Sequence, residues 1–303
     1  MQVFYGTRLY KKWGGKLFKR IYIPYLLLAL IFGNPLNVST LFRILWGSDQ
    51  TVDSVTSSHL WFLPCFFISS FIYQILFIII KKPTFRLLII ILMGTISSLL
   101  DYNSTITIQL GGALIYLSGH AETSALSIYN LGFPFDLNVA FTGIVFMYMG
   151  TVLKKMYDRY ELLENKQYLL ASITLIFPLG FLFYKLNMGY VTTTWIYAIN
   201  AISWAVYGNY LYFLLASFLL SVAFLNVAAL INNKYFARWG QYTLAIYAFH
   251  PFIMYSLNRY MQAMKVDILN VYGPLEIYTL LILIICIVSI PIIRKIDNHL
   301  IGE

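Results

Sequence analysis

The stretch LWFLPCFFISSFIYQILFIII, residues 60–80, decides the fold class. It carries no charged residue and is long enough to cross the hydrocarbon core of a bilayer, which takes about 20 helical residues. Similar apolar runs occupy residues 87–100 and 278–293. A helix that is hydrophobic on every side must be surrounded by lipid or by other apolar helices. The sequence therefore predicts an all-α, polytopic transmembrane helix bundle.

The composition of the whole chain supports this prediction. Of its 303 residues, 60% are hydrophobic and only 11% are charged, and the mean hydropathy is +0.73. A soluble globular domain is about 45–50% apolar and about 25% charged. The chain therefore has too few charges to cover a water-exposed surface. This excludes a soluble enzyme, a disordered chain, a collagenous fibre and a disulfide-stapled secreted domain.

Hydropathy places about eight membrane spans along residues 1–303, which we treat as a single integral-membrane domain. Two of the segments between spans, 102–136 and 185–209, are too long for simple turns, and we expect re-entrant or interfacial helices there. The predicted spans are residues 17–33, 59–80, 84–101, 137–153, 168–184, 210–231, 242–259 and 275–293.

The positive charges predict the orientation of these spans. A net charge of +9 suggests a nucleic-acid binder, but the basic residues lie in short clusters between apolar runs. With the N-terminus in the cytoplasm, 17 of the 21 Lys and Arg fall on the cytoplasmic side. The outer side holds only Arg43, Lys185, Arg259 and Lys265. This bias is typical of multi-pass membrane proteins, so we expect both termini in the cytoplasm, a bilayer as the partner and no nucleic acid.

Three places carry residues suited to ligand binding or catalysis. The first is the basic cluster Lys16, Lys19 and Arg20, just before the first apolar run. Clustered cations can hold a phosphorylated ligand, although they also serve as a simple anchor to anionic lipid. The other two are His59, at the outer mouth of the second span, and His250, about midway through the span 242–259.

Each histidine has a functional and a structural interpretation. Neutral imidazole can take a proton from an alcohol near pH 7, and an ionisable group at membrane depth is a candidate functional residue. Alternatively, His59 is an interfacial or capping residue and His250 is hydrogen-bonded inside the bundle. The sequence contains no HExxH, CxxC, P-loop or GxSxG motif, so we expect no metal.

Four stretches, in this order, resemble acyltransferase family 3, the integral-membrane O-acyltransferases, and in particular its fucose 4-O-acetylase-like branch. The second matches the Leu-Trp-Phe-Leu signature of that branch. The third resembles a family helix that ends in a glycine and basic residues, and the fourth a pattern with a histidine near the C-terminus. The stretches are KLFKRIYIPYLL (16–27), HLWFLPCFF (59–67), PFDLNVAFTGIVFMYMGTVLKK (134–155) and WGQYTLAIYAFHPFI (239–253).

This resemblance implies transfer of an acyl group, most simply acetyl from acetyl-CoA, to a hydroxyl of an extracytoplasmic sugar or polysaccharide. Lys16, Lys19 and Arg20 would hold the phosphates of the CoA donor. The glycan acceptor would approach from the outer side near His59. It also implies a multi-pass protein of the cell membrane, most simply a bacterial plasma membrane.

The sequence also departs from the family pattern. The family has ten core spans, and the first carries an arginine and a histidine regarded as catalytic. This sequence begins where the end of the second family span would lie, so it resembles a family member without its first two helices. His59 and His250 are then supporting candidates for catalysis. Phe66 and Phe67 occupy positions at which other branches have glutamates.

Two other functions remain open at the level of sequence. An inactive fragment or partner-binding subunit is compatible with the missing family histidine, and we expect residues 1–303 alone to transfer acyl groups poorly. A transporter of polysaccharide or lipid-linked sugar would show internal symmetry and charged residues within several spans. The sequence shows neither feature clearly.

Overall fold

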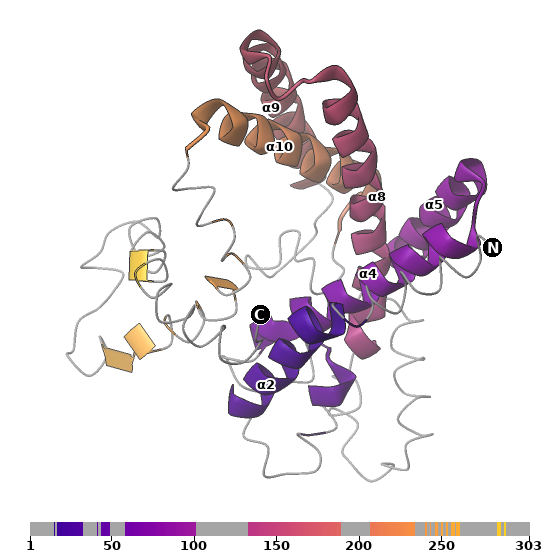
Figure 1. Cartoon of the computed structure of the whole chain (residues 1–303), viewed down its shortest axis with the longest axis vertical. Coiled ribbons are helices and arrows are strands. Elements are labelled where there is room, and N and C mark those ends of the chain that lie inside the picture. Colours follow the sequence, from indigo (N-terminus) through magenta and orange to yellow (C-terminus); the bar gives the residue numbers. More distant parts are fainter. Residues whose placement is uncertain are drawn as a thin grey trace.

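The computed structural model describes residues 17–32, 44–48, 58–100, 133–188 and 207–233, together with single positions from 15 to 41 and from 240 to 288 (Figure 1). Within these ranges the chain forms helices and turns and no strand. The predicted all-α helix bundle is therefore confirmed.

The described residues up to Leu100 form two apolar helices of 18 and 17 residues and several shorter elements. The first helix begins as a π-helix, η1 (Phe18–Tyr22), and continues as α2 (Ile23–Phe32). After the short 3₁₀ helix η3 (Ser58–Trp61) come α4 (Phe62–Ile79) and α5 (Pro83–Leu99).

The described ranges 133–188 and 207–233 contribute three helices of 22 to 24 residues. A 3₁₀ turn, η4 (Pro134–Asp136), leads into α8 (Leu137–Tyr160). It is followed by α9 (Lys166–Met188), which continues through Pro178, and by α10 (Tyr210–Ile231).

Among the described residues, four helices are long and apolar enough to cross a membrane: α4, α8 with the preceding η4 turn, α9 and α10. The helix α5 is apolar but shorter. These helices, with α2, overlap six of the eight predicted spans. The predicted spans 242–259 and 275–293, and the loops 102–136 and 185–209, lie mostly outside the described residues.

The helices pack as two neighbouring groups. Both α4 and α5 lie against α8, and α9 pairs with α10 (Figure 1). Gly180 allows the close approach in the second group, because a Cβ atom there would lie 3.1 Å from the backbone nitrogen of Leu220. Small residues at helix contacts are typical of membrane bundles, where close backbone packing replaces hydrophobic driving force.

Buried polar side chains join the helix ends. At one end, the Tyr157 hydroxyl of α8 donates to Asn226 Oδ1 of α10 at 2.5 Å, and Asn226 Nδ2 donates to Ser172 Oγ of α9 at 2.6 Å. At the other end of the α9–α10 pair, Asn187 Nδ2 donates to the carbonyl of Tyr207 at 2.9 Å. The first group of residues lies near the predicted cytoplasmic face and the second near the predicted outer face, as alternating spans require.

The N-terminal helix covers the first part of α4. Leu17, Ile21, Tyr25 and Ala29 recur every four residues, so they form one buried stripe along η1 and α2. This stripe packs against a cluster that includes Leu60 and Leu63. The Tyr25 hydroxyl donates to the carbonyl of Ile44 at 2.6 Å.

Candidate functional site

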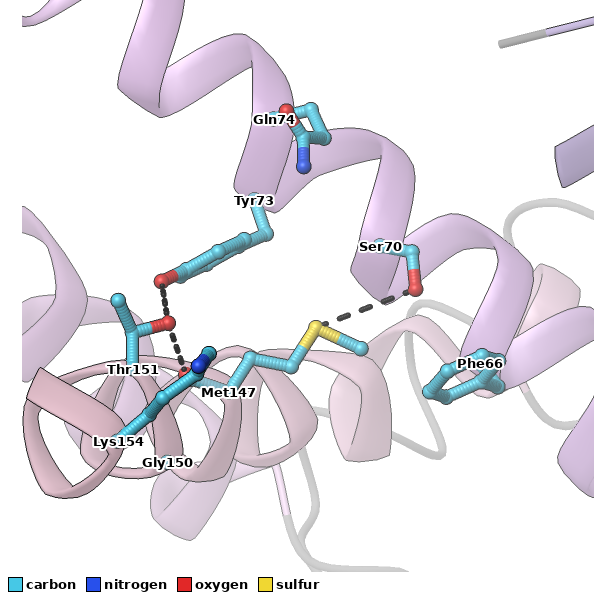
Figure 2. A pocket seen from close by; sticks show the side chains of 8 residues that line it. All are labelled: Phe66, Ser70, Tyr73, Gln74, Met147, Gly150, Thr151 and Lys154. Carbon is cyan, nitrogen blue, oxygen red and sulfur yellow. Dashed lines mark hydrogen bonds between the residues drawn. The ribbon is translucent and has the colours of Figure 1, made fainter. Parts of the chain in front are cut away.

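A groove with a volume of about 350 Å³ lies between α4 and α8 (Figure 2). The α4 residues recur at intervals of three or four, as do those of α8, so each set lies on one helix face. The lining residues are Phe66, Ser70, Tyr73 and Gln74 from α4, and Met147, Gly150, Thr151 and Lys154 from α8.

Two glycines of α8, one heptad apart, determine where the helices touch and where they separate. A Cβ atom at Gly143 would lie 2.9 Å from Ser69 Oγ, so the helices are in tight contact at this level. Ser69 Oγ also donates to the carbonyl of Ala140 at 3.1 Å across the same contact. At Gly150 a Cβ atom would meet nothing within 4 Å. The missing side chain at Gly150 therefore leaves part of the groove open.

The groove changes character along its length. Phe66 and Met147 line one end (Figure 2), and Ser70 Oγ donates to Met147 Sδ at 4.0 Å. At the other end, the Tyr73 and Thr151 hydroxyls lie 2.6 Å apart. Lys154 follows on the next turn of α8. Its Nζ lies 2.8 Å from Asp158 Oδ2, and both side chains are mostly exposed to solvent, at 75% and 63%.

A second polar cluster lies at the start of α8. Ser97 Oγ donates to the carbonyl of Asn138, and it lies 2.8 Å from Thr142 Oγ1 and 3.1 Å from the Tyr207 hydroxyl. Thr142 Oγ1 is also 3.0 Å from the Tyr210 hydroxyl. Burial raises the pKa of Tyr207, which precedes α10, so its hydroxyl stays protonated. This cluster holds α5, α8 and α10 together.

One atom of this second cluster stands out. Among the described residues, Asn138 Oδ1 is buried without a hydrogen-bond partner. The Asn138 Nδ2 group donates to the carbonyl of Leu100 at 3.4 Å. A buried acceptor without a donor costs free energy, so a water molecule is the simplest partner for this oxygen.

The predicted basic cluster lies beside the first half of α4. Lys19 and Arg20 are exposed residues of η1, and Lys16 lies outside the described residues. The Tyr22 ring, one turn further on, lies 5.1 Å from the Phe67 ring. The structure therefore places Lys19 and Arg20 near the η3 end of α4, and Lys154 belongs to the opposite end of the groove.

The two predicted histidines belong to neighbouring elements. His59 is in η3, which leads directly into Phe62, and its side chain lies outside the described part of the structure. The Phe62 ring lies 5.2 Å from the Tyr247 ring, which is 5.6 Å from the ring of His250. The segment that carries His250 therefore reaches the start of α4.

His250 has a defined hydrogen bond at its helical position. Its Nδ1 lies 2.7 Å from the carbonyl oxygen of Tyr247. A carbonyl oxygen only accepts, so Nδ1 carries the proton and Nε2 is the nitrogen that can accept one in the neutral ring. Within the described ranges, no three His, Cys, Asp or Glu side chains come close enough together to hold a metal ion.

The sequence did not point to the groove residues individually. Gly150 and Lys154 belong to the stretch 134–155, which was singled out as a whole. Tyr73 and Thr151 are 78 residues apart, and their pairing depends on how α4 and α8 align. The signal present in the sequence was Gly143 and Gly150 on one helix face, followed by Lys154 and Lys155.

Comparison with known proteins identifies the family. The model of acyltransferase family 3, described as an acyltransferase domain, matches residues 3–294, which is nearly the whole chain. No curated protein and no solved structure matches the chain. Together with the membrane-length apolar helices, the match shows that this chain belongs to acyltransferase family 3 and is a membrane acyltransferase.

Proposed function

We propose that this protein transfers an acetyl group from acetyl-CoA to a hydroxyl of an extracytoplasmic sugar or polysaccharide in the cell membrane. The observation that carries this proposal is the family match over residues 3–294. The predicted charge bias adds a direction to the reaction, because it gives the protein a cytoplasmic face for the donor and an outer face for the acceptor.

The reaction has simple requirements. The acceptor oxygen forms a bond to the acetyl carbon, and the bond from that carbon to the CoA sulfur breaks. The proton of the hydroxyl must go to a base, and the leaving thiolate is then protonated to the CoA thiol. A histidine base contributes about 10²–10⁴-fold to such a step. His59 and His250 are the candidates in this chain for accepting that proton or for supporting its transfer.

The first test is product formation in the cells that carry the gene. Deletion of the gene is expected to remove acetyl groups from an extracellular glycan, and its return on a plasmid to restore them. The acetyl groups of the glycan should be released by mild alkali, because O-esters are labile and N-acetyl groups are not. A glycan with unchanged O-acetylation in the deletion strain would contradict the proposed acceptor.

The second test concerns the donor. We propose that Lys16, Lys19 and Arg20 contact the CoA phosphates, because three cations within five residues suit a polyanion. Single exposed charges contribute little, so all three are changed to alanine together in the full chain. Binding of acetyl-CoA should weaken while the variant still inserts into the membrane. Unchanged binding would indicate that these residues only anchor the first helix.

A further inference from the structure

The proposed function gives no role to the groove between α4 and α8. The groove follows α4 from Phe66 to Gln74 and α8 from Met147 to Lys154. At 1.5 Å per helical residue, these spans correspond to about 12 Å and about 10 Å. The groove therefore runs along both helices, is open on one side and has a volume of about 350 Å³. A linear ligand fits this shape better than a bulky one.

The chemistry of the lining follows one order. Phe66 and Met147 supply apolar surface at one end, and the Ser70, Tyr73 and Thr151 hydroxyls supply hydrogen-bonding groups along the groove (Figure 2). Lys154 supplies a positive charge at the other end. A ligand that matches this order has an anionic head, a chain with amide groups and a small apolar end.

We propose that this groove binds the S-acyl pantetheine arm of an acyl-CoA donor, with the diphosphate at Lys154 and the thioester toward Phe66. This inference rests on the proposed function, because that function supplies the donor. It assigns the diphosphate to Lys154 in place of Lys19 and Arg20, which lie near the other end of the groove. Pantetheine is a linear chain with two amides, whose N–H groups can donate to the hydroxyl oxygens of the groove, since the hydroxyl hydrogens are already used within the protein. Its diphosphate carries the negative charge that Lys154 complements.

The direction of the arm follows from the ends of the groove. Lys154 lies within the last two turns of α8, on the predicted cytoplasmic side, where acyl-CoA is available. At the other end, Phe66 lies 5.7 Å from Phe62, and Phe62 lies 5.2 Å from Tyr247. Tyr247 in turn lies 5.6 Å from His250. The thioester is therefore directed toward the part of the molecule that holds His250.

Asp158 provides a sensitive test of the charged end. Its carboxylate pairs with Lys154 at 2.8 Å, in an exposed i,i+4 ion pair. A phosphate near Lys154 would be repelled by this carboxylate and would share the same ammonium group. Removing the carboxylate should therefore strengthen the binding of a phosphorylated ligand, although it removes an ion pair of the folded protein.

The experiment measures equilibrium binding of acetyl-CoA and of S-acetylpantetheine to the purified full chain in lipid nanodiscs. Gly150→Leu places a side chain in the groove at a position where a Cβ atom meets nothing within 4 Å. It should weaken both ligands about tenfold or more. Ala171→Leu, on an exposed position of α9, is the matched control and should leave both affinities unchanged.

The charge variants separate the two ends of the ligand. Lys154→Gln should weaken acetyl-CoA about fivefold, the expected size of one exposed charge pair. It should not change S-acetylpantetheine, which has no diphosphate. Asp158→Asn should tighten acetyl-CoA and leave S-acetylpantetheine unchanged. Both positions are exposed, so these variants should fold even if Gly150→Leu inserts poorly.

The outcomes distinguish this inference from the proposed function. If the wild-type chain binds acetyl-CoA but Gly150→Leu, Lys154→Gln and Asp158→Asn all bind it equally well, the groove assignment is wrong and the donor assignment stands. If Lys154→Gln weakens both ligands equally, the proposed orientation is wrong. If the wild-type chain binds neither ligand at millimolar concentration, both the groove and the proposed donor are rejected.

Discussion

At the scale of single residues, the proline that follows His250 explains the hydrogen bond of its side chain. In an α-helix the carbonyl of Tyr247 would accept from the backbone N–H of residue 251, but residue 251 is proline and has none. The Nδ1 of His250 lies 2.7 Å from that carbonyl and supplies the missing donor. The same bond fixes the tautomer, so Nε2 is left as the basic nitrogen of the ring.

Two substitutions separate these roles. In His250→Asn the amide nitrogen can still donate to the Tyr247 carbonyl, but no basic nitrogen remains. If His250 accepts the acceptor proton, acetyl transfer should fall about 10²–10⁴-fold with little change in melting temperature. His250→Ala should lower transfer similarly and also destabilise the fold by about 1–3 kcal/mol, because a carbonyl loses its partner.

The control for this pair is His120→Ala, since the sequence predicts that His120 lies in an outer loop. Transfer should be unaffected there. Wild-type turnover by His250→Asn would show that His250 serves only to satisfy the Tyr247 carbonyl. The measurements are the rate of acetyl transfer and the melting temperature of the purified protein.

Residue type predicted some candidates and could not predict others. His250 was found because an ionisable group at membrane depth is unusual. Tyr73 and Thr151 were not found, because hydroxyl residues are common in membrane helices and only the alignment of α4 with α8 brings these two together. Asn138 was missed for the same reason, since its hydrogen-bond partners are Ser97 of α5 and Leu100 directly after α5.

At the scale of elements, the contact between α9 and α10 depends on one glycine. A Cβ atom at Gly180 would lie 3.0 Å from a Leu220 side-chain carbon and 3.1 Å from the Leu220 backbone nitrogen. Gly180→Leu should therefore push the helices apart and lower stability by about 1–3 kcal/mol. Gly150→Leu makes the same substitution where nothing lies within 4 Å, so its melting temperature should stay close to wild type.

Thermal unfolding of the two variants under the same conditions tests this difference. Equal melting temperatures would mean that α9 and α10 are not packed as tightly as described. The hydrogen bonds from Tyr157 to Asn226 and from Asn226 to Ser172, of 2.5 and 2.6 Å, require the same helix spacing. The result therefore also tests these two bonds.

The sequence located the long helices well but not all their ends. Hydropathy predicted a span to residue 153, whereas α8 continues to Tyr160. The additional turns carry charge, and the Lys154–Asp158 pair at i,i+4 supports a helix in water. Apolarity marks the part of a helix that sits in lipid, so it cannot mark where the helix itself stops. The π-helical start at Phe18–Tyr22 also has no signature in the hydropathy.

At the scale of the whole molecule, charge and structure support the same order of helices. Polar bonds join residues near one set of helix ends, Tyr157, Ser172 and Asn226, and a separate bond joins Asn187 to Tyr207 at the other. The 17-to-4 distribution of Lys and Arg predicts that the first set faces the cytoplasm and the second the outside. Neither observation alone gives both the order and the orientation.

This agreement leads to a prediction for the topology of the full chain. Single cysteines at Ser57 and Lys155, introduced with Cys65 and Cys286 replaced by alanine, should react with a membrane-impermeant maleimide from opposite sides. Ser57→Cys precedes η3 and should label from outside intact cells, whereas Lys155→Cys, beside Lys154, should label only after the membrane is opened. The background without introduced cysteines should not label. Labelling of both positions from outside intact cells would place Lys154 away from the cytoplasm, and the groove could then not receive acyl-CoA at that end. Labelling of both positions only after the membrane is opened would contradict an odd number of crossings between them.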